Sequence, residues 1–549
     1  MSSPAIASPV ADGGVVRDSA RIALGTGLSR VTGLIRVGIF AWALGQSGIA
    51  DAFNLANVLP NLLYELVLGG VLSATLVPLF VDADRSGQDD GRGRQTDDVR
   101  SVIWSVGFTA ALALTVVGLA GVALVSSLFG GGRVGAEQVR WDALIMLAAL
   151  LVPQIFFYGL TTLAGAALNA RRIFSPPAYT PVLTNIVTSV GLIAVGLRFD
   201  TTDPRLEFAT ADRTAVLWLG ITTTAGIAAM AFPLLVVVRR DLPALRWRPQ
   251  FRHPVIQRLL RMSTWTVGYV VANQLALLVI TALLNGRRDG SLTAYQQAFI
   301  FFQLPHGLFA VSLMTTVLPS LSSAHLADDL DEFRNQFLSG LRLVLVVILP
   351  AAAGYVALAA PLVATLLERG AFTSSNTEVT SRTLIAFALG LPGFSVYLYA
   401  LRAFYARSDT KRPFVLNVIE NLINVTVAVG IAAAFGAGAP GMAAAFSVAY
   451  TISAGLALRR LAAEIGGFGP PARSTALDVG RMSVAALAMG VLVAGVARSA
   501  GADLSGGVIT QLAIGVVVGV LTYGALATTL QVRVLAELMA SVRTRLTRA

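Results

Sequence analysis

The chain has 549 residues, of which 55% are hydrophobic and 13% are charged, and its mean hydropathy is +0.72. A soluble protein carries about 25% charged residues, so this composition excludes an ordinary soluble enzyme or binding domain. Cysteine is absent, which excludes disulfides, thiolate catalysis and cysteine-ligated metals. The net charge of +11 is explained better by basic loops of a membrane protein than by nucleic acid binding.

Apolar runs long enough to cross a bilayer recur along the whole chain, and they predict an all-α polytopic membrane protein with about fourteen transmembrane helices. Residues 1–16 are small and polar, and we expect a disordered N-terminal tail rather than a cleaved signal. An N-lobe, 17–238, is predicted to hold helices at 20–44, 52–82, 99–129, 142–168, 178–198 and 214–238. Pro60, Pro153, Pro305, Pro350 and Pro392 fall within apolar runs and are predicted kinks.

A basic cytoplasmic linker is expected at 239–261. The C-lobe, 262–462, is predicted to hold helices at 262–285, 292–326, 337–367, 383–405, 414–435 and 440–458. The segment 463–530 contributes two more helices, at 478–497 and 508–530. The basic tail 531–549 either lies on the inner leaflet as an amphipathic helix or simply enforces topology.

The distribution of basic residues predicts the orientation in the membrane. With the N-terminus in the cytoplasm, the inside segments hold 28 Arg and Lys residues and the outside segments hold ten. Basic residues favour the cytoplasmic side, so we expect a multi-pass protein of the bacterial cytoplasmic membrane with both termini inside.

Weak internal repetition indicates two related halves. Ala170-Arg171 with Pro177 matches Ala406-Arg407 with Pro413, and the same offset of 236 takes Asn185 onto Asn421. Each half would contain an even number of helices, so the halves share one topology. This predicts a pseudo-two-fold axis along the membrane normal, with the last two helices outside the repeat.

Two arginines interrupt the first apolar run. A cation at mid-bilayer costs about 2.5–3.5 kcal/mol and is retained where it faces a wet cavity or a partner. Ser29 and Arg36 share a helical face with Gly25, Thr32 and Gly33, whereas Arg30 lies about 120° away from Arg36. The small residues would let a neighbouring helix or a ligand approach closely.

Arginine offers a planar fork of donors that matches phosphate oxygens, so these residues predict a site for an anionic ligand such as a diphosphate. The alternative is that Arg30 and Arg36 only pair with acids, for which Asp51, Glu65 and Glu420 are the candidates.

Other polar residues in the apolar runs are candidate cavity residues. Asn61 follows Pro60, and Glu65 is either a switching counter-ion or half of a structural charge pair. Gln303 and His306 flank Pro305, where they line a cavity or form a polar seam between helices. The expected helix at 414–435 contains four residues that favour interhelical hydrogen bonds over an ion site: Asn417, Glu420, Asn421 and Asn424.

No nucleotide-hydrolysing machinery is expected. The chain's lysine, Lys411, is not preceded by a phosphate-binding glycine loop, so ATP hydrolysis is disfavoured. The three histidines are far apart in sequence, which disfavours a histidine metal site. We therefore expect no cofactor and no enzymatic activity, and the coupling ion, if transport uses one, is left open.

Four stretches of the sequence resemble the MurJ (MviN) family of lipid II flippases, within the multidrug/oligosaccharidyl-lipid/polysaccharide exporter superfamily. They spread over most of the chain and comprise Ser29-Arg30 through Arg36 with Ala50-Asp51-Ala52-Phe53 and Leu59-Pro60-Asn61-Leu62-Leu63; Leu168-Asn169-Ala170 with Phe174-Ser175-Pro176, Pro181 and Asn185-Ile186; Val317-Leu318-Pro319-Ser320-Leu321-Ser322; and Gly370-Ala371-Phe372-Thr373 with Phe404-Tyr405-Ala406-Arg407 and Pro413.

The resemblance implies two six-helix lobes around a cationic cavity, and two C-terminal helices that form a lipid-accessible groove. It implies alternating access that moves an undecaprenyl-diphosphate-linked peptidoglycan precursor from the inner to the outer leaflet. Arg30 and Arg36 match two cavity arginines of the family, and Ser29 matches the serine beside the first. Membrane lipids, and cell-wall synthesis or division proteins, are the partners that this implies.

The chain departs from the family pattern at four positions: many members carry an acid at the positions of Val37 and Gly69, and an arginine at the positions of Tyr64 and Ile300. Because half of the expected cations are missing, the expected cavity is less positive, which bears on the substrate more than on the fold. Two other functions stay open, namely export of another polyprenyl-linked glycan or amphiphile, and a non-transporting scaffold for envelope assembly.

Overall fold

The structure of the protein is a computed structural model. The structure describes residues 13–64, 93–130, 135–171, 173–198, 213–241, 246–285, 290–436, 438–503 and 507–532. These ranges are helical apart from short connections, and they contain no strand, which confirms the all-α prediction.

The chain divides into two compact units. The first comprises 1–44 and 52–267, and the second comprises 45–51 and 268–549. In the first unit the helices are α1 (Gly13–Leu44), α2 (Gly48–Tyr64), α4 (Gly93–Phe129), α5 (Ala136–Leu151), α6 (Gln154–Ala170), α7 (Ser175–Arg198), α8 (Arg213–Asp241) and the start of α9 (Pro254–Leu284).

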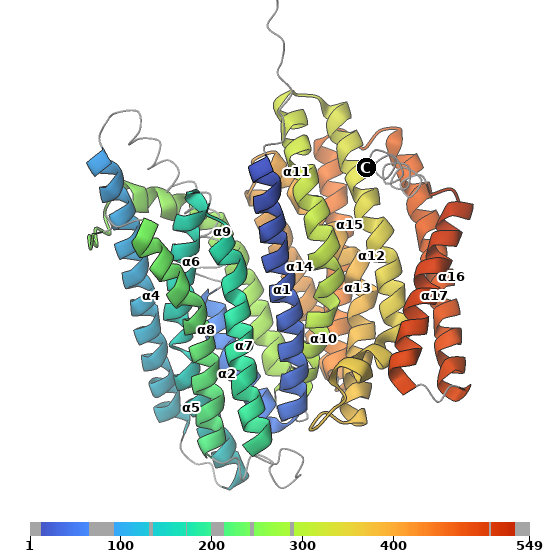
Figure 1. The fold of residues 1–549 in the computed structure, drawn as a ribbon. Coiled ribbons are helices and arrows are strands. Elements are labelled where there is room, and N and C mark those ends of the chain that lie inside the picture. The colour runs from blue at the N-terminus through green and yellow to red at the C-terminus, as the bar shows by residue number, and fades with distance from the viewer. Residues whose placement is uncertain are drawn as a thin grey trace, which may run out of the picture. The chain divides into compact units, whose positions relative to one another are not determined.

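The second unit takes in the first residues of α2 and the rest of α9. Its other helices, which lie side by side in Figure 1, are α10 (Ser291–Pro305), the π-helical turn η4 (His306–Ala310), α11 (Val311–Leu326), α12 (Leu330–Leu367), α13 (Ser374–Ala406), α14 (Lys411–Phe435), α15 (Ala439–Glu464), α16 (Pro471–Asp503) and α17 (Gly507–Thr529).

Several helices extend beyond the predicted apolar cores. α1 begins at Gly13, inside the segment that the sequence assigns to a disordered tail, and α8 and α9 leave 242–253 as the connection within the expected linker. The second predicted helix is described as far as Tyr64, and the basic tail lies outside the described residues from position 533.

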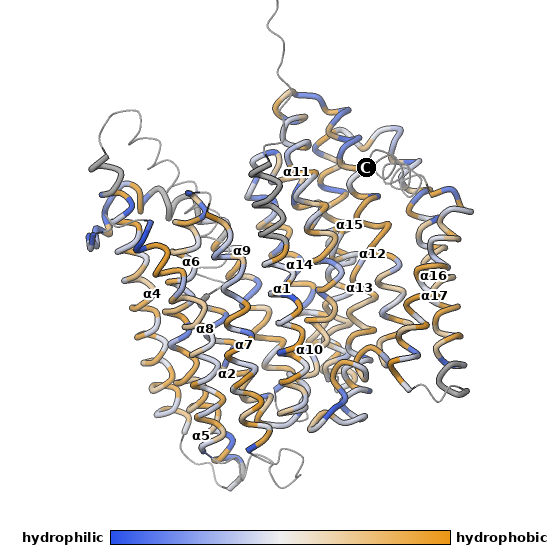
Figure 2. Tube along the Cα trace, in the orientation of Figure 1, coloured by the Kyte–Doolittle hydropathy of each residue, from blue (hydrophilic) through white to orange (hydrophobic). Residues whose placement is uncertain are grey.

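Thirteen segments of the described chain are long and apolar enough to span a membrane. Figure 2 shows hydrophobic residues along the middle of the helices and hydrophilic residues gathered near many helix ends. Large apolar side chains remain exposed on the outer helices, including Val117 of α4, Val491 of α16 and Val520 of α17. Exposed apolar patches of this extent fit helices that face lipid rather than water.

Prolines divide two of the predicted helices. Pro153 lies at the turn that separates α5 from α6, where the sequence predicts one helix at 142–168. Pro305 ends α10, and the next five residues form the π-helical turn before α11. Proline removes a backbone donor and crowds the preceding turn, which accounts for both interruptions.

Aromatic and small residues hold the second unit together. Phe302 and Phe387 have ring centroids 5.2 Å apart, and Phe446 packs edge-on against both. At Gly390 an added Cβ would lie 2.4 Å from the Ser447 hydroxyl, so only glycine permits α13 and α15 to approach this closely. Close packing of this kind makes the unit a firm support for the polar residues within it.

Candidate functional site

The small-residue face of α1 is covered by a neighbouring helix. An added Cβ at Gly25 would lie 3.0 Å from the Tyr179 ring of α7. The Asn185 side chain of α7 donates hydrogen bonds to the Ser29 carbonyl oxygen at 3.1 Å and to the Thr32 hydroxyl at 3.0 Å. Of the two uses predicted for this face, the structure therefore gives the part from Gly25 to Thr32 to a neighbouring helix, and the backbone of Ser29 is already hydrogen-bonded.

The two arginines of α1 lie in different surroundings. Arg30 is exposed, whereas Arg36 is half-buried and close enough to Tyr158 of α6 for an electrostatic interaction. Among the residues that the structure describes, no carboxylate forms an ion pair with either guanidinium. Two cations held in an apolar helix without such a partner are available to an anionic ligand.

Of the acids proposed as alternative partners, the two described ones are engaged elsewhere or lack a donor. Asp51 accepts hydrogen bonds from the backbone of Gly290 at 2.7 Å and from the Thr293 hydroxyl at 2.7 Å. Glu420 is buried, and neither of its carboxylate oxygens has a hydrogen-bond partner within the described chain. The third acid, Glu65, lies outside the described residues, as does Gly69.

Within the described residues, the remaining candidate site residues do not form a single cluster. Asn61 is exposed on α2, and Gln303 is exposed on α10. His306 is buried, its Nδ1 lies 3.0 Å from the Ser395 hydroxyl, and its ring contacts Phe394 edge-on with centroids 4.7 Å apart. His306 thus forms the polar seam that was the second of its two predicted roles.

The internal repeat is visible in equivalent contacts of the two units. Asn185 bonds to α1 in the first unit, and Asn421, at the predicted offset, donates to the Asn273 side chain of α9 at 2.8 Å in the second. Asn417 donates to the same oxygen at 2.8 Å. The asparagines of α14 therefore form the interhelical hydrogen bonds that the sequence favours.

The repeated arginines end their helices in the same way. Arg171 and Arg407 follow α6 and α13 with φ of −90° and −93° and ψ of 9° and 14°. Arg171 donates to the backbone carbonyl of Asp241 at the end of α8, and Arg407 bonds to Glu464 at the end of α15. Each arginine therefore joins the ends of equivalent helices in its own unit.

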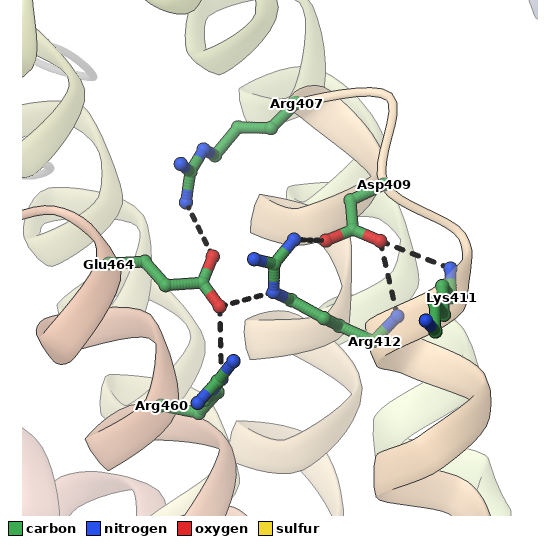
Figure 3. Close-up of polar contacts among 6 residues, drawn as sticks. All are labelled: Arg407, Asp409, Lys411, Arg412, Arg460 and Glu464. Atoms are coloured by element: carbon green, nitrogen blue, oxygen red, sulfur yellow. Dashed lines mark hydrogen bonds and ion pairs between the residues drawn. The ribbon is translucent and has the colours of Figure 1, made fainter.

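A charge cluster at one end of the second unit extends this contact (Figure 3). The Glu464 carboxylate pairs with Arg407 and Arg460 at 3.1 Å each and also with Arg412. Arg412 pairs in turn with Asp409, whose Oδ1 accepts from the Arg412 backbone at 3.1 Å. The cluster fixes the α13–α14 connection to α15.

Burial and hydrogen bonding act in opposite directions on Asp409. Burial opposes ionisation of its carboxyl, but hydrogen bonds from the side chain and backbone of Arg412 outweigh this and lower its pKa. Asp409 is therefore a charged member of the cluster at neutral pH.

An apolar groove lies between α12, α16 and α17. Its volume is about 510 Å³, and its lining includes Leu358, Met489, Gly515 and Gly519. The hydroxyl of Tyr523, which also lines it, donates to the Val346 carbonyl at 3.0 Å, so the ring presents its apolar surface to the groove. The groove has the chemistry of a site for a hydrocarbon chain.

The resemblance implied a groove formed by the C-terminal helices, but the sequence did not identify the residues that line it, nor the position of Tyr158 near Arg36. The groove residues are small or apolar and are indistinguishable in sequence from ordinary helix packing. For Asn185 a signal was available, because its match to Asn421 marks a polar residue kept at the same place in both halves.

Comparisons with known proteins agree with this architecture. The family model described as lipid II flippase MurJ matches residues 40–514. A lipid II flippase MurJ of Burkholderia cenocepacia is 30% identical over 390 residues, covering 70% of this chain and 72% of the relative. A probable lipid II flippase MurJ of Haemophilus influenzae is 27% identical over 482 residues, covering 85% and 89%.

Solved structures show the same fold. A lipid II flippase MurJ in an inward closed conformation has a TM-score of 0.73 at 24% identity, covering 93% of this chain and 98% of that one. An inward-facing multidrug resistance MATE family transporter of the MOP superfamily has a TM-score of 0.64 at 13% identity, covering 80% and 95%. Since the family model spans most of the sequence, the chain belongs to the MurJ family of lipid II flippases.

Proposed function

We propose that this protein moves the lipid-linked peptidoglycan precursor lipid II from the inner to the outer leaflet by alternating access between its two halves. The family match supports the substrate class and a transport role rather than an enzymatic one. The observation that carries the proposal is Arg36, a half-buried guanidinium in an apolar helix that pairs with no described carboxylate. A diphosphate supplies the oxygens that such a group binds best.

The proposed ligand contacts follow from the chemistry of each part. Arg30 and Arg36 bind the diphosphate, with Ser29 beside Arg30. The exposed amides of Asn61 and Gln303 are available to the sugar and peptide groups, and Glu65 stays a proposed counter-ion. The apolar groove of α12, α16 and α17 receives the prenyl chain. His306 is left out of this set because it is buried against Ser395.

The positive-inside distribution of arginine supports an orientation with both termini in the cytoplasm. In this orientation the charge cluster around Glu464 and the connection between α8 and α9 both lie on the cytoplasmic side. The two ends of the chain then face the compartment in which the precursor is made.

The departures from the family pattern favour one second candidate, the export of another polyprenyl-diphosphate glycan. Tyr64 and Ile300 stand at positions where many members carry arginine. A cavity with fewer cations binds the diphosphate less strongly, so contacts with the glycan contribute more to substrate specificity.

Complementation of a flippase-depleted strain tests the proposal, with lipid II accessible in the outer leaflet as the readout. Arg36→Ala and Arg30→Ala should each lower this signal. Arg382→Ala is the matched control, since Arg382 is exposed and pairs with Glu378 one helical turn away. Rescue of growth with no effect of either α1 substitution would reject the arginine site. Failure of the unsubstituted chain to export lipid II would favour the other glycan or a scaffold.

A further inference from the structure

In the first unit, the short basic segment 246–248, which follows α8 in the chain, is bound to α4 by hydrogen bonds and an ion pair. The backbone amide of Arg246 donates to the Ser101 hydroxyl at 2.9 Å, and that of Arg248 donates to the Ser105 hydroxyl at 2.7 Å. The Arg248 side chain pairs with Asp98 of α4 at 2.8 Å. These three contacts fix the backbone of 246–248, and they therefore fix the Cα positions of Arg246 and Trp247.

Segment 246–248 contributes Arg246 and Trp247 to the lining of a cavity of about 550 Å³. This volume lies within the range of roughly 300–1,000 Å³ that is usual for ligand sites. Trp104 and Phe108 come from α4, and the ring of Phe108 meets Trp247 edge-on with centroids 5.5 Å apart. From α8 come the apolar Phe232 and Val236 and, at its last turn, Arg239. The lining therefore combines two arginines with aromatic and aliphatic side chains.

The two arginines that line this cavity differ from Arg248 in their ion pairing within the described residues. Within the described ranges, no carboxylate pairs with Arg239 or Arg246, whereas Arg248 is neutralised by Asp98. Phe232 is 56% exposed and Trp247 is 58% exposed, so the apolar part of the cavity opens to the surroundings of the helices, which in a membrane are lipid chains. Indole rings beside arginines are typical of the level at which lipid headgroups meet the hydrocarbon.

We propose that this cavity binds an anionic glycerophospholipid of the adjacent leaflet, independently of the transported substrate. The phosphodiester lies between the guanidinium groups of Arg239 and Arg246, and one acyl chain lies along Phe232 and Val236. Charge complementarity selects the occupant: a zwitterionic lipid brings a cation next to these arginines, whereas an anionic headgroup brings none.

Tryptophan quenching by brominated lipid tests the site in the full-length protein reconstituted in phosphatidylcholine bilayers. Bromine on an acyl chain quenches a nearby indole, and Trp104 and Trp247 are two of the six tryptophans. A minor fraction of brominated phosphatidylglycerol should quench about twofold more strongly than the same fraction of brominated phosphatidylcholine. The excess should disappear in Trp104→Phe/Trp247→Phe and should fall as salt is raised, because salt screens the attraction.

The charge requirement is tested with the double variant Arg239→Gln/Arg246→Gln. The matched control is Arg240→Gln/Arg252→Gln, which removes the same charge from exposed residues that do not line the cavity. The first variant should lose the preference for the anionic lipid, and the second should keep it. Equal quenching by the two lipids in the unsubstituted protein, or equal loss in both variants, would overturn the proposal.

Competition separates this site from the transport site. Undecaprenyl diphosphate should leave the brominated phosphatidylglycerol signal unchanged. Displacement of that signal by an equimolar amount would assign the cavity to the transported lipid and reject the phospholipid. The salt response of the unsubstituted protein keeps the test decisive even if the double variant folds poorly.

Discussion

At the scale of single residues, the role of α1 depends on what surrounds its two guanidinium groups. Arg36 is half-buried, near a tyrosine and without a described carboxylate partner, whereas Arg30 is exposed. The two arginines are separated around the helix, so a diphosphate that binds both must span part of its circumference. Geometry of the donor groups, and not charge alone, then decides how well the ligand is held.

Arg36→Lys tests this geometric requirement. Lysine keeps the charge but cannot form two parallel hydrogen bonds to phosphate, so transport should fall by roughly tenfold despite the unchanged net charge. The rate of lipid II appearance in the outer leaflet is the measurement, with Arg382→Lys as control. Full activity of Arg36→Lys would mean that Arg36 acts as a simple point charge.

Asn185→Ala tests the contact between α1 and α7. The substitution removes two hydrogen bonds to α1 and should lower the free energy of unfolding by about 1–2 kcal/mol. Thermal unfolding in detergent measures the loss. Thr32→Val removes one of the two acceptors and should cost about half as much. An unchanged melting temperature in Asn185→Ala would show that these bonds do not hold α1.

At the scale of the elements, the charge cluster around Glu464 and the apolar groove have different roles. The cluster around Glu464 joins the end of α15 to the α13–α14 connection, at the ends of the candidate membrane spans. The groove between α12, α16 and α17 is lined by apolar residues, with glycines among them. The first feature is expected to affect stability, and the second to affect transport.

Acidification tests the charge cluster. Because the folded-state pKa of Asp409 is below its ordinary value of 3.8, its ionised form stabilises the fold. That stabilisation is fully present above the ordinary value and is lost as pH falls through the lowered pKa. Melting temperatures of the unsubstituted chain and Asp409→Asn should therefore converge at low pH and differ near neutrality. A constant difference across this range would show that Asp409 does not contribute through its charge.

Gly519→Leu tests the groove. An added Cβ at Gly519 would make ordinary contacts, 3.4 Å to Val493 and 3.7 Å to Met489, so the substitution fits and its side chain fills space in the groove. Export of the prenyl-linked substrate should fall by about tenfold while the melting temperature stays unchanged. Gly495→Leu on α16, where an added Cβ meets nothing within 4 Å, is the control. Equal export by both variants would exclude the groove from transport.

At the scale of the whole molecule, the apolar runs predicted the helices well because the bilayer sets their length and composition. The boundaries differ where helices continue into water, as in α8 to Asp241, since hydropathy marks only the apolar part. The breaks at Pro153 and Pro305 were predictable because proline has a defined effect on a helix. The offset between Asn185 and Asn421 indicates the repeat from the sequence alone.

The candidate site was less predictable because a polar residue in an apolar helix can either line a cavity or bond to another helix. His306 and Gln303 lie one turn apart around the same proline, yet the first is buried and the second is exposed. The helical phase of α1 identified its small-residue face correctly, but the sequence does not specify that Asn185 covers it. Such choices depend on which helices pack together, and tertiary contacts decide that.

Binding of a lipid diphosphate by the α1 arginines is the step on which the proposed transport depends. The most direct test is the initial rate of lipid II translocation in vesicles that contain the purified chain or its Arg30→Ala/Arg36→Ala variant. The unsubstituted chain should translocate lipid II, and the double variant should be close to inactive while keeping its melting temperature. Equal rates for the two proteins would show that transport does not need the α1 arginines.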